Sequence, residues 1–466
     1  MAGSARPRGL GLRKGPNSAF GDATIARMSD SRPQQLVHAD WVWTGGRLER
    51  GRAVGIGGDG RVTSVMPPSS PSTLRLPGKA LIPGFVSAHS HAFQRGLRGL
   101  TERFRGQSGT GTGFFSWRDS MYQLVASMTP EQCYELSRQC FAEMLSSGIT
   151  SVGEFHYLRH ASSEGDTLQY AFDASVLSAA HDVGIRIVLL HTCYMDGGFG
   201  KPLAGGQLRF RTTDEQEYWN RFDALAAACR DSTQTVGATA HSVRAVPIDT
   251  IERLHRESVR RAAVFHMHVE EVQQEITDCQ SAHGKRPTEL LLERLAMDQR
   301  FTAVHCTHTS ADDLTALAKT GATVCLCPLT EGNLGDGICD VRALRSAGGA
   351  IAFGTDLNSR IAPTEELRWI EYVQRLRYES RGLVVGSDGD TGAELLAIGT
   401  RNGARSLGLN AGSIQPGMLA DLAIVDLNHV TMLGWTPESF ASHLIFGVGT
   451  SAVCGTCVGG KWRIRR

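Results

Sequence analysis

The sequence predicts an α/β protein in which a (β/α)8, TIM-like barrel carries a small composite β-sandwich domain formed by both ends of the chain. The chain has 466 residues, well above the roughly 150 residues expected of one domain. Residues 83–412 read as short apolar strands that alternate with helical segments, the pattern of a parallel barrel. Short alternating strands with glycine turns occur before and after this region, so we assign residues 36–82 and 413–466 to the composite domain.

The composition indicates a globular enzyme from a reducing compartment, and we expect it in the cytoplasm. Apolar residues make up 41% and charged residues 20%, which is enough to bury a sizeable core. The formal net charge is +1, whereas a nucleic-acid-binding protein would show a concentrated basic excess. No run of about 18 uncharged apolar residues occurs, so no membrane-spanning helix is expected. Eleven cysteines in so long a chain do not indicate a disulfide framework.

Residues 1–35 are rich in arginine, glycine, serine and proline. A transit peptide has a similar composition, but the apolar face that such a peptide needs is weak here. Pro7 and Pro16 would also interrupt any long helix, and Met28 is an equally good start of translation. We expect this segment to be a disordered extension without a catalytic role.

The composite domain is predicted from short strands at the two ends of the chain. A short hairpin is marginally stable by itself, so we expect strands from both ends to pair. The expected strands are residues 36–43, 53–56, 61–65, 422–426 and 452–463.

The barrel is predicted from eight short apolar strands, at residues 84–91, 149–157, 185–193, 234–242, 263–269, 301–306, 322–327 and 350–356. Residues 129–148 show the helical pattern between them, with Thr129 as N-cap, Pro130 at the first helical position and Gly148 after the last turn. In this fold the chemistry lies at the C-terminal ends of the strands. Two glycine-rich stretches, 106–113 and 197–206, are expected to form loops over that end of the barrel.

Two His-x-His pairs lie at predicted strand ends. His89 and His91 end the first strand, and because side chains alternate along a strand they face the same side and can reach one metal ion. His266 and His268 end the fifth strand. We expect His268, nearer the barrel mouth, to be a ligand, and His266 to be a buried structural residue one layer below.

Three further titratable residues follow strand ends. Glu271 comes three residues after His268 and could reach over a metal-bound water, although with Glu270 it could also be a solvated helix start. His305 ends the sixth strand and Asp356 the eighth. His308 is the alternative to His305, but it lies past the strand end.

These motifs resemble the amidohydrolase superfamily, in its mononuclear deaminase branch, over almost the whole chain from residue 36. The resemblance implies that His89, His91, His268 and Asp356 bind one Zn²⁺, with Glu271, His305 and Asp356 as catalytic residues. Many binuclear members bridge two metal ions with a carbamylated lysine on a middle strand. This chain has no lysine between Lys201 and Lys285, so one metal ion is expected. The segments that carry the resemblance are Pro83-Gly84-Phe85-Val86-x-x-His89-x-His91, Thr400-x-Asn402-Gly403-Ala404 and Gly417-x-x-Ala420-Asp421-Leu422.

Within this branch the local motifs resemble the formimidoylglutamate deiminases. The resemblance implies hydrolysis of N-formimino-L-glutamate to N-formyl-L-glutamate and ammonia in histidine degradation, and a homodimer. After Asp356 such enzymes carry Ser then His, whereas this chain has Leu357 and Asn358, so the floor of the pocket is expected to differ. The motifs are Glu154-Phe155-His156-Tyr157, His241-Ser242-Val243-Arg244, and residues 91–95, 117–118 and 327–337.

The expected substrate carries two carboxylates and a cationic formimino group. Arg244 and Arg118 suit the carboxylates, because a guanidinium group can make two parallel charge-assisted hydrogen bonds. A surface salt bridge is the alternative for each arginine, more so for Arg118 because Arg244 follows a strand end. Gln94, Tyr157 and His241 would supply the remaining polar contacts.

The expected mechanism follows from these charges. Zn²⁺ lowers the pKa of a bound water to about 7. Asp356 and His305 would orient that water and take its proton, and Glu271 would bind the imino nitrogen and pass on the proton that lets ammonia leave.

Two other interpretations remain open at this stage. The chain could be a zinc deaminase for a nucleobase, a triazine or a guanidino acid, or a barrel that has lost its chemistry and acts as a binding protein. The complete set of histidines and carboxylates favours an enzyme. The pair Cys454-x-x-Cys457 is expected to be structural, since a zinc ribbon needs a second pair.

Overall fold

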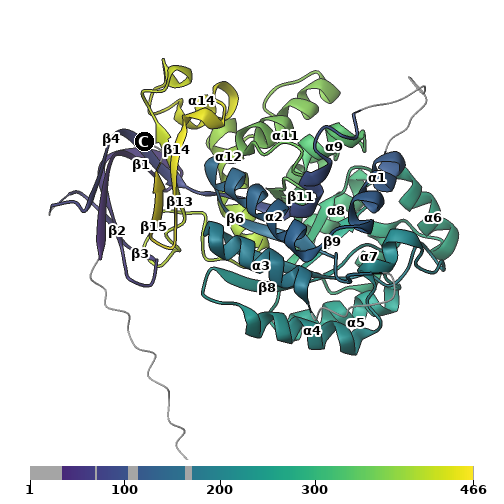
Figure 1. The fold of residues 1–466 in the computed structure, drawn as a ribbon. Helices are drawn as coiled ribbons and strands as arrows, with labels where there is room; N and C mark the ends of the chain where they lie inside the picture. Colours follow the sequence, from purple (N-terminus) through teal and green to yellow (C-terminus); the bar gives the residue numbers. More distant parts are fainter. Residues whose placement is uncertain (1–33, 69–70, 103–113, 163–169, 465–466) are drawn as a thin grey trace, which may run out of the picture.

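The computed structural model describes residues 34–68, 71–102, 114–162 and 170–464. It contains an eight-stranded parallel sheet that forms a barrel and a seven-stranded mixed sheet beside it (Figure 1). The expected disordered extension, apart from its last two residues, and the glycine-rich stretch 106–113 lie outside the described residues.

All eight predicted barrel strands are confirmed, with ends shifted by at most three residues. Backbone hydrogen bonds from Thr355 to His89 and from His91 to Asp356, both 2.9 Å, join the last strand to the first. Most of these strands are buried along their whole length, which is why they read as apolar runs. The strands are β5 (Phe85–Ser90), β6 (Ile149–His156), β7 (Arg186–Cys193), β8 (Gln234–Ala240), β9 (Phe265–Val269), β10 (Phe301–His305), β11 (Thr323–Leu326) and β12 (Ala350–Phe353).

Helices cover the outside of the barrel. The predicted helix after residue 129 is α2 (Pro130–Ser146), and the Thr129 side chain accepts a hydrogen bond from the Gln132 backbone while Gln132 caps Thr129 in return. None of the described helices is long and apolar enough to span a membrane. The others are α1 (Phe114–Ala126), α3 (Ala171–Val183), α4 (Glu215–Ala228), α5 (Ile248–Arg260), α6 (Gln273–His283), α7 (Pro287–Arg294), α8 (Ala311–Lys319), α9 (Pro328–Leu334), α10 (Val341–Ser346), α11 (Pro363–Tyr378), α12 (Thr391–Ala397), α13 (Gly403–Ser406) and α14 (Phe440–Gly447). Short helical turns are η1 (Ala92–Leu97), η2 (Gly205–Phe210), η3 (Ile398–Asn402), η4 (Val430–Met432) and η5 (Thr450–Ala452).

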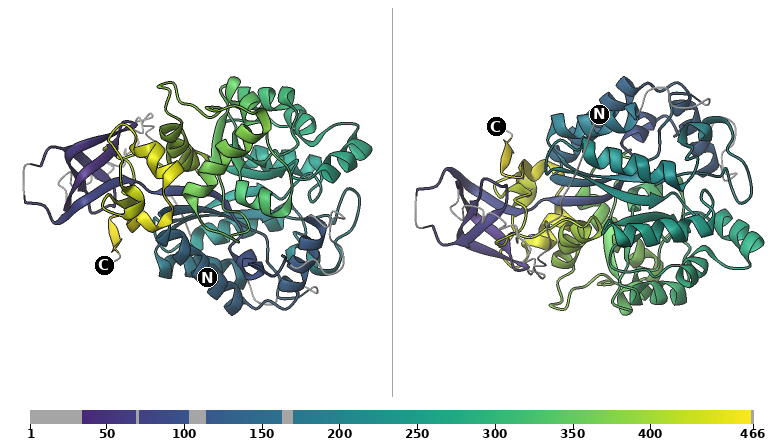
Figure 2. Two further views of the ribbon diagram at one scale, coloured as in Figure 1. Left: turned by 90° about the horizontal axis from the view of Figure 1, so that it is seen from above. Right: turned by 90° about the horizontal axis from the view of Figure 1, so that it is seen from below.

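Both chain ends contribute to the second sheet, as predicted, and Figure 2 shows them side by side at one end of the molecule. The expected sandwich is a single mixed sheet, because β4 (Leu74–Pro83) pairs with β1 in parallel and with β13 in antiparallel orientation and so joins the two ends. Its order is β15-β14-β13-β4-β1-β2-β3. The other strands are β1 (Gln35–Thr44), β2 (Arg47–Ile56), β3 (Val62–Met66), β13 (Leu422–Asp426), β14 (Val453–Val458) and β15 (Lys461–Ile464).

A buried ion pair fastens this sheet to the barrel. Arg186, at the start of β7, places its Nε 2.5 Å from Oδ2 of Asp421 and its Nη2 3.1 Å from Oδ1. The Gly459 backbone N–H also donates to Asp421, at 2.9 Å. Both charged side chains are buried, so the aspartate of the Gly417-x-x-Ala420-Asp421-Leu422 motif has a structural role.

Replacing Asp421 by alanine is expected to lower the free energy of unfolding by about 3–5 kcal/mol, because it leaves the Arg186 charge buried without its partner. Asp426→Ala is the matched control, since Asp426 pairs with Lys79 at 2.7 Å while both side chains are about a quarter exposed. Such a pair contributes only about 0–1 kcal/mol. Denaturant unfolding of the two variants measures the difference, and equal losses would contradict the structural role of Asp421.

Candidate functional site

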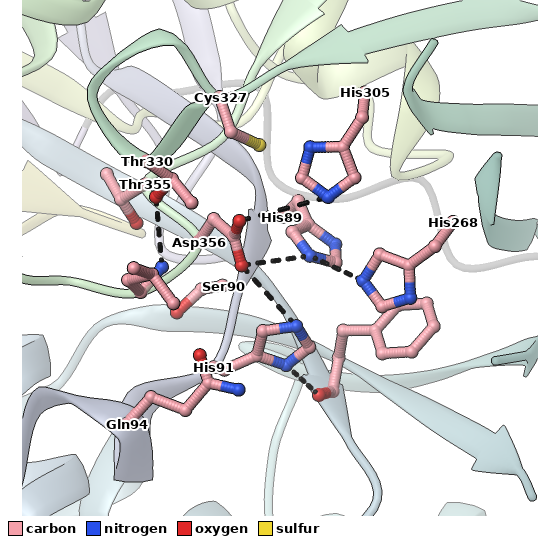
Figure 3. A network of polar contacts seen from close by, with 12 residues as sticks. His89, Ser90, His91, Gln94, His268, His305, Cys327, Thr330, Thr355 and Asp356 are labelled. Carbon is pink, nitrogen blue, oxygen red and sulfur yellow. Dashed lines mark hydrogen bonds and ion pairs between the residues drawn. The ribbon is translucent and has the colours of Figure 1, made fainter. Parts of the chain in front are cut away.

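Three imidazoles and one carboxylate meet at the C-terminal end of the barrel strands. Nε2 of His89 lies 3.2 Å from Nε2 of His268, and Oδ1 of Asp356 lies 3.5 Å from Nε2 of both His89 and His91. Figure 3 shows these groups converging from β5, β9 and the end of β12. Donor atoms of the three histidines all lie within 4.8 Å of one another, close enough to hold one metal ion.

Hydrogen bonds on the far side of two rings point their lone pairs into this cluster. Nδ1 of His91 lies 2.7 Å from the carbonyl of Phe155, and Nδ1 of His268 lies 3.0 Å from the carbonyl of His241. A carbonyl oxygen can only accept, so both Nδ1 atoms carry the proton and both Nε2 atoms are free to bind. This is the arrangement by which proteins orient metal-binding histidines.

The electrostatics of the cluster also suit a metal ion. Burial lowers the pKa of His91 to about 3 and that of His268 well below its usual range, so both rings are neutral. Burial opposes ionisation of Asp356, but hydrogen bonding to His89 and the nearby imidazoles hold its pKa below the ordinary value. Three neutral imidazoles and a carboxylate form a donor set suited to a divalent metal such as zinc.

Two of the residues here have unusual backbone conformations. His305 has φ of +74° and Asp356 has φ of +43°, in the left-handed region that residues other than glycine rarely adopt. Such conformations persist where the surrounding structure imposes them, and they gather at functional sites. Both lie where a barrel strand ends and its chain turns over the cluster.

His305 lies among three carboxylates. Its Nε2 is 3.6 Å from Oε1 of Glu271 and 3.8 Å from Oδ2 of Asp356, and its Nδ1 is 3.4 Å from Oε1 of Glu331. Burial disfavours the charged ring, but the negative charge of Glu271, the hydrogen bond to Glu331 and the charge of Asp356 raise its pKa to about 10. A cation bound beside His305 would lower this pKa.

His308 and His266, the alternatives to His305 and His268, form hydrogen bonds away from the cluster. Nε2 of His308 donates to the carbonyl of Asp336 at 2.6 Å. Nε2 of His266 donates to the carbonyl of Ser406 at 2.8 Å, one layer below the cluster. It is therefore His305 and His268 that reach the site.

A cavity of about 350 Å³ opens beside the cluster. Besides His91, His268, Glu271 and Asp356, it is lined by all five residues expected to contact substrate: Gln94, Arg118, Tyr157, His241 and Arg244. Gln94, on η1, donates to the Tyr157 hydroxyl at 2.6 Å. Lys201, in the loop after β7, also lines the cavity; sequence reasoning missed it because no strand end or motif marks this lysine.

Arg244 lies between two carboxylates. Its Nη2 is 3.6 Å from Oε2 of Glu271, and its Nε is 3.4 Å from Oε1 of Glu275. Glu275 is fully buried, and burial raises its pKa to about 7. Sequence reasoning missed Glu275, which lies in the first turn of α6, four residues after Glu271.

Leu357 and Asn358 stand where the resemblance predicts Ser then His, and they leave the cluster intact. Leu357 lines the cavity floor, and its backbone N–H donates to the Thr330 hydroxyl at 3.3 Å. Asn358 is buried, and its Nδ2 donates to the Ser90 hydroxyl at 3.1 Å and to the Asp356 carbonyl at 2.8 Å. The Asn358 side chain and the Leu357 backbone therefore help to hold the Asp356 loop beside β5.

Comparison with known proteins agrees with the resemblance found in the motifs. A model described as the amidohydrolase family matches residues 80–463. The chain is 35% identical over 416 residues to formimidoylglutamate deiminase from Pseudomonas aeruginosa, covering 88% of this chain and 90% of that one. It is 26% identical over 400 residues to 5-methylthioadenosine/S-adenosylhomocysteine deaminase from Natronomonas pharaonis, covering 84% and 82%. The crystal structure of an amidohydrolase from Brucella melitensis superposes with a TM-score of 0.83 at 31% identity, covering 93% and 95%.

Proposed function

The chain belongs to the amidohydrolase family and is a hydrolase of C–N bonds, and from that premise we propose that it hydrolyses N-formimino-L-glutamate to N-formyl-L-glutamate and ammonia. The proposal includes one zinc ion per chain, held by His89, His91, His268 and Asp356. The formimidoylglutamate deiminase at 35% identity supports the substrate, although more distant relatives act on nucleosides.

One observation carries the proposal: Arg244 lies 3.6 Å from Glu271 in the cavity beside the cluster. In formiminoglutamate only the α-carbon and the α-nitrogen separate the α-carboxylate from the formimino carbon. The group that binds this carboxylate must therefore lie next to the group that handles the departing nitrogen. An arginine is the side chain best suited to a carboxylate, because its planar fork pairs with both oxygens. Arg118, on α1, is suited to the second carboxylate.

Asp356 and Glu271 carry out the proton transfers of the proposed reaction. When bound, the metal supplies a nucleophile at neutral pH by lowering the pKa of a water molecule to about 7. The water oxygen adds to the formimino carbon, and the bond from that carbon to the terminal nitrogen then breaks. Asp356 accepts one proton from the water and gives it to the departing nitrogen, and His305, with a proton on Nε2, stabilises the oxygen. Burial raises the pKa of Glu271, which lets it take up the other water proton and deliver it to the same nitrogen, so that both water protons leave with the ammonia.

A nucleoside deaminase is the second candidate. The observation that favours it is the aromatic wall of the cavity, formed by Trp117, Tyr122, Tyr157, Tyr194 and Phe210. Aromatic side chains can stack on a base, but they can also exclude water around a small substrate.

The test is ammonia release by the zinc-loaded protein, with formiminoglutamate, guanine, 5'-methylthioadenosine and a guanidino acid offered separately. We expect turnover of formiminoglutamate at a kcat/KM far above the others. Turnover of the nucleoside alone would replace the proposal with the second candidate, and would leave the metal cluster in place.

Arg244→Met is expected to raise KM for formiminoglutamate by about 10- to 100-fold, the loss of one or two charge-assisted hydrogen bonds. The control substrate is the formimino derivative of 4-aminobutyrate, which lacks the α-carboxylate. Steady-state kinetics on both substrates separate binding of that group from indirect effects on Glu271. An equal rise of KM for the two would show that Arg244 does not bind the α-carboxylate.

A further inference from the structure

We propose that Glu331 is a positioning residue that orients the His305 imidazole toward the reacting centre. The role deepens the proposed function, on which its kinetic test rests. Glu331 is not part of the three-histidine cluster and does not line the cavity beside it.

The geometry places His305 between carboxylates on opposite sides of its ring. Oε1 of Glu331 lies 3.4 Å from Nδ1, while Nε2 faces Glu271 at 3.6 Å and Asp356 at 3.8 Å. An ionised carboxylate can only accept a hydrogen bond, so Glu331 requires a proton on Nδ1. This leaves Nε2 as the nitrogen that acts at the centre.

Glu331 is itself held in place. It lies on α9, directly after β11, and its Oε1 also accepts a hydrogen bond from the Cys327 backbone N–H at 2.8 Å. The side chain of the preceding residue, Thr330, accepts from the backbone of Leu357, next to Asp356. The short helix α9 therefore connects the His305 ring with the loop that carries Asp356.

His305 needs such a partner because its other contacts do not fix the ring. Its backbone is in the left-handed region, and its Nε2 has no hydrogen-bond partner among the described residues. The Nδ1 contact with Glu331 is the hydrogen bond that keeps Nδ1 protonated and fixes the rotation of the ring. A carboxylate on the far nitrogen of a histidine commonly has this function.

A cation is the alternative occupant of this place, since donor atoms of His305, Cys327 and Glu331 lie within 4.8 Å of one another. The Oε1 that faces the ring already accepts from the Cys327 backbone, which favours the hydrogen bond. Metal analysis separates the two: we expect one zinc per chain in the presence of excess zinc. A second equivalent that is lost in Cys327→Ser would overturn the positioning role.

The kinetic experiment compares Glu331→Met with Glu366→Met. Glu366, on α11, is a matched control: it is fully buried and accepts the Leu329 backbone N–H of the same helix α9 at 3.0 Å. No hydrogen bond or ion pair joins it to His305 in the described structure. We expect Glu331→Met to lower kcat by about 10- to 100-fold with little change in KM or zinc content.

Glu366→Met is expected to lose stability but to keep kcat near the wild-type value. Glu331→Gln, which retains an accepting oxygen without the charge, should recover part of the activity lost in Glu331→Met. Equal kcat losses in Glu331→Met and Glu366→Met would overturn the proposal, because they would show a purely structural effect on α9.

Two further measurements keep the proposal testable if Glu331→Met does not fold or formiminoglutamate is not turned over. Nitrogen-15 NMR of the zinc-loaded wild-type protein, with the His305 signals identified by their loss in His305→Asn, must show a protonated Nδ1. A ring protonated only on Nε2 would contradict the role whatever the substrate. In a His305→Asn background, Glu331→Gln should cause no further loss of kcat; independent losses in the two variants would contradict it equally.

Discussion

Replacing Glu271 by glutamine is expected to leave one zinc per chain in place and to lower kcat by about 10²- to 10⁴-fold, the contribution of a positioned acid–base group. Glutamine keeps the size of the side chain and can still form hydrogen bonds, but it cannot carry a proton to the departing nitrogen. Glu271 is not part of the three-histidine cluster, so metal binding should survive. Metal analysis and steady-state kinetics on the same preparation give both numbers.

Glu270→Gln is the matched control for this variant. Glu270 is equally buried, but its carboxylate faces away from the cavity, where it accepts from the Thr288 backbone and from Arg286, both at 3.1 Å. Its replacement should lower stability and leave kcat close to the wild-type value. Wild-type turnover in Glu271→Gln would remove Glu271 from the mechanism, and equal losses in both variants would indicate damage to the loop.

The second large effect concerns the metal. Removing it with a chelator is expected to lower ammonia release by several orders of magnitude, because no nucleophile then forms at neutral pH. The protein should also lose stability, by about 4 kcal/mol if the free metal was present at 1,000 times its Kd. One equivalent of zinc should restore both activity and stability.

The His-x-His pair on β9 offers a matched control for this prediction as well. His268→Gln should lose the metal, since Nε2 of His268 faces His89 at 3.2 Å. His266→Gln should retain it, because His266 is bound to the Ser406 carbonyl below the cluster. Full metal content in His268→Gln would contradict the ligand set.

The barrel could be predicted because its strands and helices are marked by short, local sequence patterns. Strands buried on both faces must be apolar along their length, and the helices between them carry caps such as Thr129 that can be read from the sequence. The strand β4 was missed because Pro77 and Gly78 interrupt it and resemble a turn. Gly78 has φ of +67°, and the register of β4 against β1 shifts near this point.

Residues at strand ends could be predicted, because the fold brings all C-terminal ends to one face. That rule brings together His89, His268, His305 and Asp356, although their contacts had to come from the structure. Glu331 could not be found in this way, since it lies on a helix and reaches the His305 ring through tertiary packing. The same holds for Glu275, whose contact with Arg244 depends on how α6 approaches the loop after β8.

The central claim concerns which C–N bond of the formimino group is broken. Mass spectrometry of the products formed from N-formimino-L-glutamate in ¹⁸O-labelled water by the zinc-loaded protein tests it most directly. We expect N-formyl-L-glutamate with one ¹⁸O atom, together with an equal amount of ammonia. Glutamate and formamide would show cleavage of the other bond and would contradict the roles given to Glu271 and Arg244, and unchanged substrate would contradict the proposed function itself.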